Sequence, residues 1–450
     1  MRIFKNKALA AGAVAAALLL SACGGQTPSA GGKQQIEMWF WGAPPAHQKE
    51  MQQVLVDGFN KSQDKYQLKV TFDNAVDKNI DVALAANRGP DVVYGSGPAF
   101  AAAYVAKGKL ADMTPYSDKY DWKDRILDPM YESGTVDGKL YSLPNSLNNI
   151  GVFYNKAVLD KLGVGIPTTT AELNAAMDKA QAAGLYASVT GNKGWKPVNE
   201  NYASLFLTHA AGGKTVYDAL QGTTSWTDPK IAAAIDASKD FYQKGYLAGK
   251  DYSNLNFVES MQLLSQGKAP FMFGPSLAFQ FATDSFNDKN GNTNDLGFMP
   301  FPNIDESLAS PNFTLGSTAS LSINNASKNK DGAAAVIDFM MTESFSTDMT
   351  KTWPGYWAVP LKKFDAAPDE FTGLSKPYVQ AMKDMIAGVN EGHYGFFAGT
   401  FFPPATATAF DDIDSVWLGK TSTTDFLKTV DKTFAEEKAK GLVPPVPEPK

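Results

Sequence analysis

A pair of short apolar segments, joined by a polar bridge, lies about a third of the way along this chain of 450 residues. Residues 140–143 and 150–154 are both typical of strands, and the bridge from Pro144 to Asn149 consists largely of residues that favour turns or irregular backbone. The pair is either a hairpin, or a strand that leaves one domain followed by a strand that enters the next. We favour the second interpretation, because chains beyond about 300 residues usually divide into domains. Residues 145–149 then form a hinge beside a cleft.

Strands and helices alternate in the first third of the chain. The segments 35–41, 67–72 and 89–94 have the composition of strands, and each is followed by a segment with the periodicity of a helix. This alternation predicts an α/β fold with a mostly parallel sheet and helices on both faces. Because ligands collect at the carboxyl ends of the strands in such sheets, we expect Trp41 and Ser96 at the mouth of a site.

The rest of the chain carries further strand and helix signals. Thr169 and Glu172 have the spacing of a capping box at the start of a helix. Residues 269–273 are expected to form a strand, and residues 296–301 to form a second crossing between domains. The chain closes with a proline-rich tail at residues 441–450.

The N-terminal segment is typical of an export signal. Basic residues precede an apolar run of about 13 residues, which is too short for an ordinary membrane span of about 20, and small residues then lead to Cys23. A cysteine at this place resembles the bacterial lipoprotein signal, in which it is acylated and becomes the new N-terminus. We expect residues 1–22 to be a lipoprotein signal peptide, Cys23 to be the lipidation site and residues 23–35 to be a flexible tether. A plain secretory signal is the alternative.

Composition argues against several classes of partner. The formal net charge is −6, and removal of the signal with its three basic residues makes it −9, with no basic cluster elsewhere. We therefore expect no nucleic-acid partner. No other apolar run reaches 18 residues, so we expect contact with the membrane only through a lipid anchor. The single cysteine excludes an intrachain disulfide, and the three histidines lack metal-ligand spacing, so we expect neither a metal nor a cofactor.

A series of short motifs lies between residues 36 and 440. They are Pro-Asp-Val-Val at 90–93, Val-Asp-Gly-Lys-Leu-Tyr-Ser-Leu-Pro at 136–144, Val-Phe-Tyr-Asn-Lys at 152–156, Leu-Gly at 162–163, Pro-Thr-Thr at 167–169 with Glu172, Gln-Gly-Lys-Ala at 266–269 and Asp-Phe-Met at 338–340. In its order and spacing, together with the lipoprotein signal, this series resembles the extracellular solute-binding proteins of carbohydrate ABC importers, which are similar to maltose-binding protein.

The resemblance implies a two-lobed fold of the type II periplasmic-binding class. Each lobe would be a mostly parallel sheet flanked by helices, and several hinge crossings would join the lobes. The implied lobes are residues 36–145 with 302–345, and residues 146–301 with 346–440. An oligosaccharide would be held between them, and the closed form would dock on ABC transporter permease subunits. The protein is expected to be a monomer, lipid-anchored to the cell membrane at its extracellular or periplasmic face.

A sugar site needs flat aromatic surfaces for the apolar faces of the ring and converging polar groups for its hydroxyls. Aromatic residues outside regular elements are therefore the useful signal, although each of them can equally belong to a core. Asn145 can serve the hinge backbone as well as a ligand, and His393 can be a plain surface residue. The ligand-binding candidates are Trp41, Ser96, Asn145, Trp195, Asn199, Glu200, Ser276, Ser317, Trp353, Tyr356, Trp357, Glu391 and His393.

We expect a binding protein and not an enzyme. A receptor for a non-sugar solute, such as a peptide or a polyamine, is the first alternative, and the aromatic loops favour sugar over both. A secreted glycosidase is the second, and it would need two carboxylates facing each other at about 5–10 Å. Sequence spacing cannot show such a pair, and no Gly-x-Ser-x-Gly nucleophile motif occurs.

Overall fold

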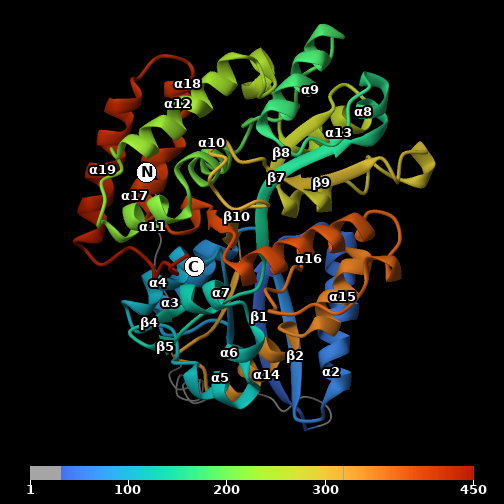
Figure 1. The fold of residues 1–450 in the computed structure, drawn as a ribbon. Coiled ribbons are helices and arrows are strands. Elements are labelled where there is room, and N and C mark those ends of the chain that lie inside the picture. The colour runs from blue at the N-terminus through green and yellow to red at the C-terminus, as the bar shows by residue number, and fades with distance from the viewer. Residues whose placement is uncertain (1–31, 318, 450) are drawn as a thin grey trace, which may run out of the picture.

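The computed structural model describes residues 32–317 and 319–449. These residues form two lobes, stacked one above the other in Figure 1, and each lobe is built around a five-stranded sheet with helices on its faces. The two-lobed α/β fold predicted from the sequence is therefore confirmed. The predicted signal peptide, Cys23 and most of the predicted tether lie outside the described residues.

The sheet of the first lobe has the order β2–β1–β3–β11–β6. As predicted, β1 (Gln34–Trp41) pairs in parallel with β2 (Tyr66–Asp73) and β3 (Val92–Gly95), whereas β11 (Ser320–Ile323) pairs antiparallel with β3 and with β6 (Leu143–Pro144). The lobe also contains the hairpin of β4 (Thr135–Val136) and β5 (Lys139–Leu140) and the helices α1 (Pro45–Met51), α2 (Gly58–Ser62), α3 (Val76–Ala85), α4 (Pro98–Val105), α5 (Thr114–Tyr120), α6 (Trp122–Arg125), α7 (Asp128–Ser133), α14 (Lys330–Met340) and α15 (Glu343–Thr352).

The sheet of the second lobe is organised around one long central strand. This strand, β7 (Leu147–Asn155), pairs antiparallel with β8 (Phe271–Pro275), β9 (Leu296–Pro300) and β10 (Phe313–Ser317), and only β12 (Tyr394–Phe396) pairs in parallel, with β10. The mostly parallel sheet predicted for each lobe is therefore wrong here, because β7 enters from the first lobe and runs opposite to its three neighbours. The helices of the lobe are α8 (Lys156–Leu162), α9 (Thr170–Ala182), α10 (Val198–Phe206), α11 (Gly213–Gln221), α12 (Pro229–Gln243), α13 (Phe257–Ser265), α16 (Ser375–Glu391), α17 (Pro404–Asp411), α18 (Asp414–Trp417) and α19 (Thr423–Lys438).

Local sequence explains where several helices begin. The Thr169 side chain accepts a hydrogen bond from the Glu172 backbone N–H at 3.2 Å, and the Glu172 carboxylate accepts one from the Thr169 N–H at 3.3 Å. This reciprocal capping satisfies backbone donors that a helix leaves unpaired in its first turn, so α9 starts at the predicted place. Asn256 and Glu259 form the same arrangement at the start of α13.

The chain crosses between the lobes at the predicted hinge. β6 belongs to the first sheet and β7 to the second, so the crossing interpretation is confirmed and the hairpin is wrong. The second crossing lies between β10, which ends at Ser317, and β11, which starts at Ser320. The prediction of a crossing at 296–301 is wrong, because these residues contain β9 and pair with β7 inside the second sheet.

Two segments lie in the lobe opposite to the one implied by the sequence. Residues 313–317 form β10 of the second sheet, although 302–345 were assigned to the first lobe. Leu361 pairs with Ile126 of the first lobe, although 346–440 were assigned to the second. A third crossing therefore falls between residue 361 and α16, which packs against β9 and β10.

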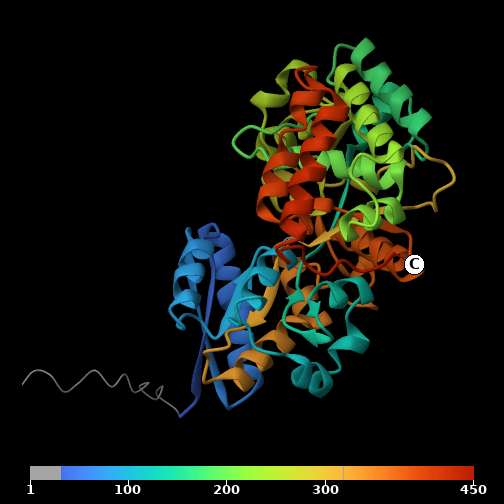
Figure 2. The same cartoon turned by 90° about the vertical axis from the view of Figure 1, so that its left-hand side faces the viewer.

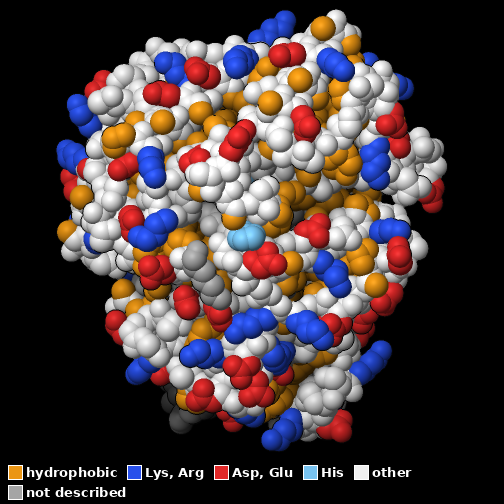
Figure 3. All heavy atoms as spheres, viewed as in Figure 1, with side chains coloured by type: hydrophobic (Ala, Val, Ile, Leu, Met, Phe, Trp, Pro, Cys, Tyr) orange, Lys and Arg blue, Asp and Glu red, His pale blue; other side chains and the backbone are white. Residues whose placement is uncertain are grey.

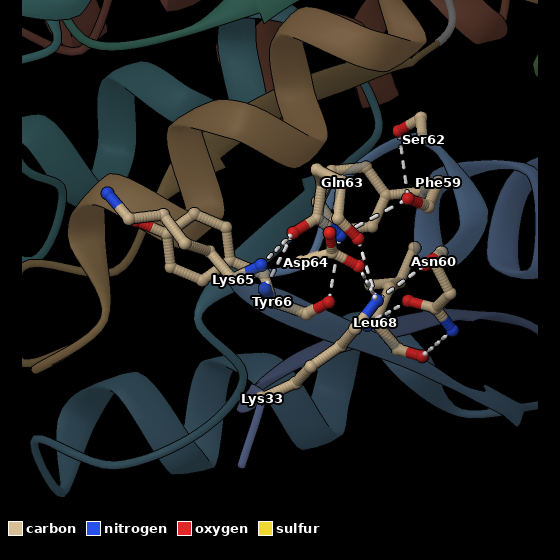
Figure 4. Close-up of polar contacts among 9 residues, drawn as sticks. All are labelled: Lys33, Phe59, Asn60, Ser62, Gln63, Asp64, Lys65, Tyr66 and Leu68. Carbon is tan, nitrogen blue, oxygen red and sulfur yellow. Dashed lines mark hydrogen bonds and ion pairs between the residues drawn. The ribbon is translucent and has the colours of Figure 1, made fainter. Parts of the chain in front are cut away.

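Polar contacts fix the start of β1 to the end of the first lobe that is remote from the hinge. Lys33 donates hydrogen bonds from Nζ to the carbonyl oxygens of Asn60 at 2.8 Å and Gln63 at 2.7 Å (Figure 4). The Gln63 side chain accepts from the Tyr66 N–H at 2.6 Å at the start of β2. The chain is thus held from Lys33 onward, and the tether predicted to reach residue 35 ends earlier.

The C-terminal segment 441–449 has no helix or strand but packs against the body of the protein. Pro444, Val446 and Pro447 are buried, and the Gln221 side chain donates to the Val446 carbonyl at 3.4 Å. Figure 2 shows the segment running along the boundary between the lobes. Within the described ranges no helix has both the length and the apolar character needed to cross a membrane.

Candidate ligand-binding cleft

The carboxyl ends of strands from both sheets meet where the lobes join. In the first lobe, β1, β2 and β3 run parallel, and Gly95 at the end of β3 pairs with Ser320, where the chain re-enters this lobe. In the second lobe, Pro275 at the end of β8 pairs with Ile150 near the hinge, and β10 ends at Ser317 beside the start of β7. The loops after these strands therefore face one another across the lobe boundary and form the candidate cleft.

The first lobe presents the ring of Trp41 at this boundary. Trp41 ends β1 and is half-buried, and its ring centroid lies 6.1 Å from that of Tyr356. The Tyr356 hydroxyl shares a hydrogen bond with the hydroxyl of Tyr94 in β3. Burial raises the pKa of both phenols, so the pair is neutral at physiological pH. Trp41 is thus an apolar surface at the cleft, supported by a neutral tyrosine pair.

Two of the predicted aromatic candidates do not reach the cleft. Trp353 and Trp357 are fully buried. Trp353 stacks on His47 with centroids 3.9 Å apart, and Trp357 stacks on Phe40 at 5.8 Å. The prediction that their rings contact ligand is wrong, because both fill the core that supports Trp41.

Asn74 and Asp77 lie at the same edge of the first lobe, and sequence reasoning missed both. A Cβ atom on Gly42 would lie 1.7 Å from the Asn74 side-chain oxygen, so Asn74 rests directly on the loop after Trp41. Asp77 lies in the first turn of α3, just beyond the end of β2, and desolvation raises its carboxyl pKa. Ligands collect at the carboxyl ends of parallel strands, and this rule led to Trp41 and Ser96. It applies equally to the end of β2, so it could have led to Asn74 and Asp77 as well.

The second lobe presents a row of aromatic rings. Trp195 is 49% exposed, in the loop before α10. Its ring centroid lies 6.1 Å from that of Phe257 at the start of α13, and Phe257 lies 6.4 Å from Phe281 at an interplanar angle of 11°. Phe281 ends the 3-10 turn η4 (Ser276–Phe281) that follows β8. The structure therefore brings the predicted Trp195 together with Phe257 and Phe281, which sequence reasoning missed.

Asn145 lies buried at the centre of the crossings. Its side chain is 1% exposed, and neither its amide oxygen nor its amide nitrogen has a hydrogen-bond partner within the described residues. Its backbone N–H donates to the Ala319 carbonyl at 3.1 Å, which joins the first crossing to the second. An unpaired buried amide is destabilising by about 1–3 kcal/mol. The Asn145 side chain therefore does not form hydrogen bonds with the hinge backbone around it.

The predicted serines at the hinge are engaged within the protein. The Ser276 hydroxyl accepts a hydrogen bond from the Asn149 N–H at 3.2 Å, and the Ser317 hydroxyl donates to the Ala319 carbonyl at 2.8 Å. Asn149 in turn accepts from the Thr314 N–H at 2.8 Å through its side chain. These contacts hold β7, β10 and η4 together, so the two serines serve the hinge and we leave them out of the proposed site.

Asn199 and Glu200 lie inside the second lobe. The Asn199 amide donates to the Asp411 carbonyl at 2.8 Å and accepts from the Tyr252 hydroxyl at 2.6 Å. Glu200 is 4% exposed and accepts from the Ser204 hydroxyl at 2.5 Å and the Gly399 N–H at 2.7 Å. Burial raises the pKa of Glu200 to about 8. Both side chains tie α10 to its neighbours, so the ligand contacts predicted for them are not supported.

The remaining polar candidates are Ser96 of the first lobe and the pair Glu391 and His393. Ser96 is exposed after β3, at the cleft edge. Glu391 ends α16 and pairs with His393 at 3.3 Å, before β12 begins. The neighbouring Asn390 side chain donates to the Lys362 carbonyl at 2.8 Å, and the Lys362 N–H donates to the Arg125 carbonyl of the first lobe at 2.8 Å. The ligand contacts expected for Glu391 and His393 remain predictions.

A cavity of about 670 Å³ lies between the lobes, lined by Tyr141 of the first lobe and by Leu220 and Pro444 of the second. Among residues 32–317 and 319–449, no group of three or more potential metal-binding side chains converges. A cavity of about 410 Å³ lies between β9 and α16, next to Tyr154 and Lys376, and none of the predicted ligand residues lines it. Acidic and basic side chains alternate over the face in Figure 3 without a patch of one sign.

Comparisons with known proteins identify chains that are similar to this one in sequence or in fold. A probable sugar-binding periplasmic protein of Mesorhizobium japonicum is 30% identical over 94 residues, which is 21% of this chain and 22% of that relative, so the chain spans only about a fifth of that relative's length. A chitin oligosaccharide binding protein superimposes with a TM-score of 0.71 at 20% identity, over 90% of this chain and 100% of that one. Maltose-bound MalE3 of T. maritima superimposes with a TM-score of 0.68 at 17% identity, over 89% and 99%.

At these identities the solved structures establish the fold, which is two-lobed in both cases. The family model described as bacterial extracellular solute-binding protein matches residues 44–344, well over half of the sequence. The chain belongs to the family of bacterial extracellular solute-binding proteins.

Proposed function

We propose that the protein captures an oligosaccharide between its two lobes and delivers it to the permease subunits of an ABC importer. One observation carries the proposal: each side of the cleft presents a partly exposed indole at a strand end or loop, Trp41 from the first lobe and Trp195 from the second. Flat aromatic surfaces complement the apolar faces of sugar rings. The family, and the sugar ligands named for the similar proteins, support the same conclusion.

Lobe closure is the proposed mechanism. A ligand that contacts both lobes at once stabilises the closed arrangement, and thus shifts the population toward it. The crossings confine this motion. Gly355, at φ +108°, lies so close to the second lobe that a Cβ atom would be 2.7 Å from the Gln280 nitrogen. The loop that carries Tyr356 is therefore in direct contact with η4, and the two lobes move about this contact.

Binding without turnover is part of the proposal. Retaining and inverting glycosidases need two carboxylates on opposite sides of the bond that breaks. On the second-lobe side, Glu259 forms an ion pair with Lys193 at 2.6 Å, and Glu200 is buried inside the lobe. Asp77 of the first lobe therefore has no evident catalytic partner among these acids.

Anchoring through Cys23, a monomeric state and a location at the extracellular or periplasmic face complete the proposal. The described chain enters the first lobe at the start of β1, which is the end of the sheet remote from the cleft. A tether attached there leaves both sides of the cleft free for ligand and permease.

Calorimetric titration of the chain without residues 1–25 tests the proposal. The panel contains cellotriose, xylotriose, maltotriose, chitin trimer and raffinose, and we expect one-to-one binding of at least one sugar with the ligand recovered intact. Trp41→Ala and Trp195→Ala should each weaken that binding at least about tenfold, because stacking is lost. Leu418→Ala is the matched control, since Leu418 is 50% exposed and caps α18, which Figure 1 shows near the top of the second lobe. Absence of binding to every sugar of the panel, or release of cleaved sugar, would contradict the proposal.

A further inference from the structure

The C-terminal segment 441–449 lies between the two lobes. Figure 1 shows it, in red, between α11 of the second lobe and α4 and α7 of the first, and Figure 2 shows the same segment at the lobe boundary. It forms neither a helix nor a strand, but Pro444, Val446 and Pro447 are buried. Because prolines restrict the backbone, the segment is stiffer than an ordinary tail. A stiff, buried segment at this place is a structural part of the boundary.

Polar contacts attach the segment to the second lobe. The Gln221 side chain, at the end of α11, donates to the Val446 carbonyl at 3.4 Å. The Tyr394 hydroxyl, in β12, donates to the Glu448 carbonyl at 3.2 Å. Where α19 ends and the segment begins, Lys438 Nζ donates to the Gln221 carbonyl. The segment therefore moves with the second lobe.

The first lobe faces this segment across the cavity of about 670 Å³. On the first-lobe side the cavity is lined by Val105 at the end of α4, Val136 in β4 and Tyr141. On the other side it is lined by Val443 and Pro444 of the segment. All five side chains are buried or half-buried. This arrangement of the lobes thus keeps apolar surface from both of them partly out of water.

Helix α7 brings the first lobe close to the same part of the second. Burial raises the pKa of Tyr394, and the negative charges of Glu132 and Asp128 on α7 raise it further. Because charges act strongly only over short distances, α7 lies near the tyrosine that holds the segment. The segment is therefore enclosed by both lobes, although its hydrogen bonds attach it to the second.

The strand order places the segment and the aromatic row on opposite sides of the crossings. The second sheet has the order β12–β10–β7–β8, and β10 and β7 carry the first two crossings. Tyr394 in β12 bonds the segment, whereas β8 leads into η4, which ends at Phe281. A rotation about the crossings that brings Phe281 toward the first lobe therefore moves β12 and the segment away from it.

We infer that the segment 441–449 opposes closure of the cleft, and that it lowers the affinity for sugar by stabilising the open arrangement of the lobes. The inference rests on the proposed function and adds a control of affinity to it. When the cleft closes, the apolar walls of the cavity separate and water reaches them, which is unfavourable. The sugar has to offset this free energy, so its apparent affinity falls.

Truncation after Gly441 removes the segment. Calorimetric titration with the panel sugar that binds most tightly should show at least about fivefold tighter binding than in the unaltered mature chain, because closure no longer separates the cavity walls. In small-angle X-ray scattering without sugar, the radius of gyration should lie nearer to that of the sugar-bound protein. Unchanged or weaker binding would overturn the inference while leaving sugar binding in place. Absence of sugar binding by the unaltered chain would instead overturn the proposed function.

Tyr394→Phe tests the same contact without shortening the chain, and it decides if the truncated chain does not fold. It removes the hydroxyl that donates to the Glu448 carbonyl and retains the buried ring, so we expect about twofold tighter binding of the same sugar. Tyr186→Phe is the matched control. It removes a hydroxyl that donates to Asp251 within the second lobe at 2.8 Å, and it should leave the affinity unchanged.

Thermal melts establish that each variant is folded. An unchanged affinity in Tyr394→Phe, or the same change in both tyrosine variants, would overturn the inference.

Discussion

The two sides of the cleft carry aromatic residues in opposite ways. On the first lobe, Trp41 packs against a cluster of buried rings that includes Trp353 and Trp357. On the second lobe Trp195 is 49% exposed, and Phe257 and Phe281 beside it are half-buried. The difference indicates a rigid surface on one side and an adaptable one on the other. Loss of a buried ring should therefore affect folding, and loss of an exposed ring should affect binding.

Trp357→Ala is expected to have the largest effect. The ring is fully buried between Phe40 and Phe345, and its removal leaves a cavity that the surrounding core cannot fill. We expect a loss of about 3–5 kcal/mol in the free energy of unfolding, measured by urea denaturation. A decrease in the free energy of unfolding of less than about 1 kcal/mol would show that these packed rings do not stabilise the first lobe.

The pH dependence of the free energy of unfolding tests the role of the buried Glu200 in the second lobe. The pKa of Glu200, about 8, lies above its ordinary value, so the folded protein holds this proton more tightly than the unfolded chain does. The contribution is fully present below about pH 4.5 and is lost as the pH rises toward 8, by at most about 1.4 kcal/mol per pH unit. Urea denaturation from pH 5 to pH 8 should show this decline, and Glu200→Gln should flatten it. An identical decline in both proteins would rule out Glu200 as its source.

The hinge between the two sides contains a matched pair of asparagines. Asn145 and Asn149 are equally buried, but Asn149 accepts a hydrogen bond from Thr314 and Asn145 has no side-chain partner. Asn149→Leu should lower the free energy of unfolding by about 1–3 kcal/mol, and Asn145→Leu should raise it by up to about 1 kcal/mol. Opposite signs in thermal melts would confirm that Asn145 is unpaired in this arrangement of the lobes, and equal losses would contradict it.

Trp195→Ala should have the smallest effect on folding. Nearly half of this side chain is already exposed, so its removal should change the free energy of unfolding by less than about 0.5 kcal/mol while it weakens sugar binding. The same urea titration that is used for Trp357→Ala measures it. A large loss of stability would mean that the second-lobe row is part of the core, and the contrast between the two sides would fail.

Local sequence signals predicted much of the fold. The alternation in the first third gave the parallel strands β1 to β3, and the bridge after Pro144 gave the first crossing. The position of β9 was not predictable in this way, because a strand beside the hinge strand and a crossing strand have the same apolar composition. Pairing partners distant in sequence decide between them.

The site was predicted less well than the fold, for a physical reason. Trp41 and Trp195 are partly exposed, at a strand end and in a loop, but Trp353 and Trp357 lie in an equally irregular and aromatic segment and are buried. Burial depends on what the rest of the chain packs against, which local composition does not contain. Asp77 was missed because a charged residue at a helix start is ordinary.

Closure of the lobes around a sugar is the central claim, and small-angle X-ray scattering tests it most directly. The mature chain is measured alone and with a saturating amount of the panel sugar that binds most tightly. We expect the radius of gyration to fall when the sugar is added, because the lobes rotate together about the three crossings. An unchanged radius, with the sugar bound, would contradict closure between the lobes.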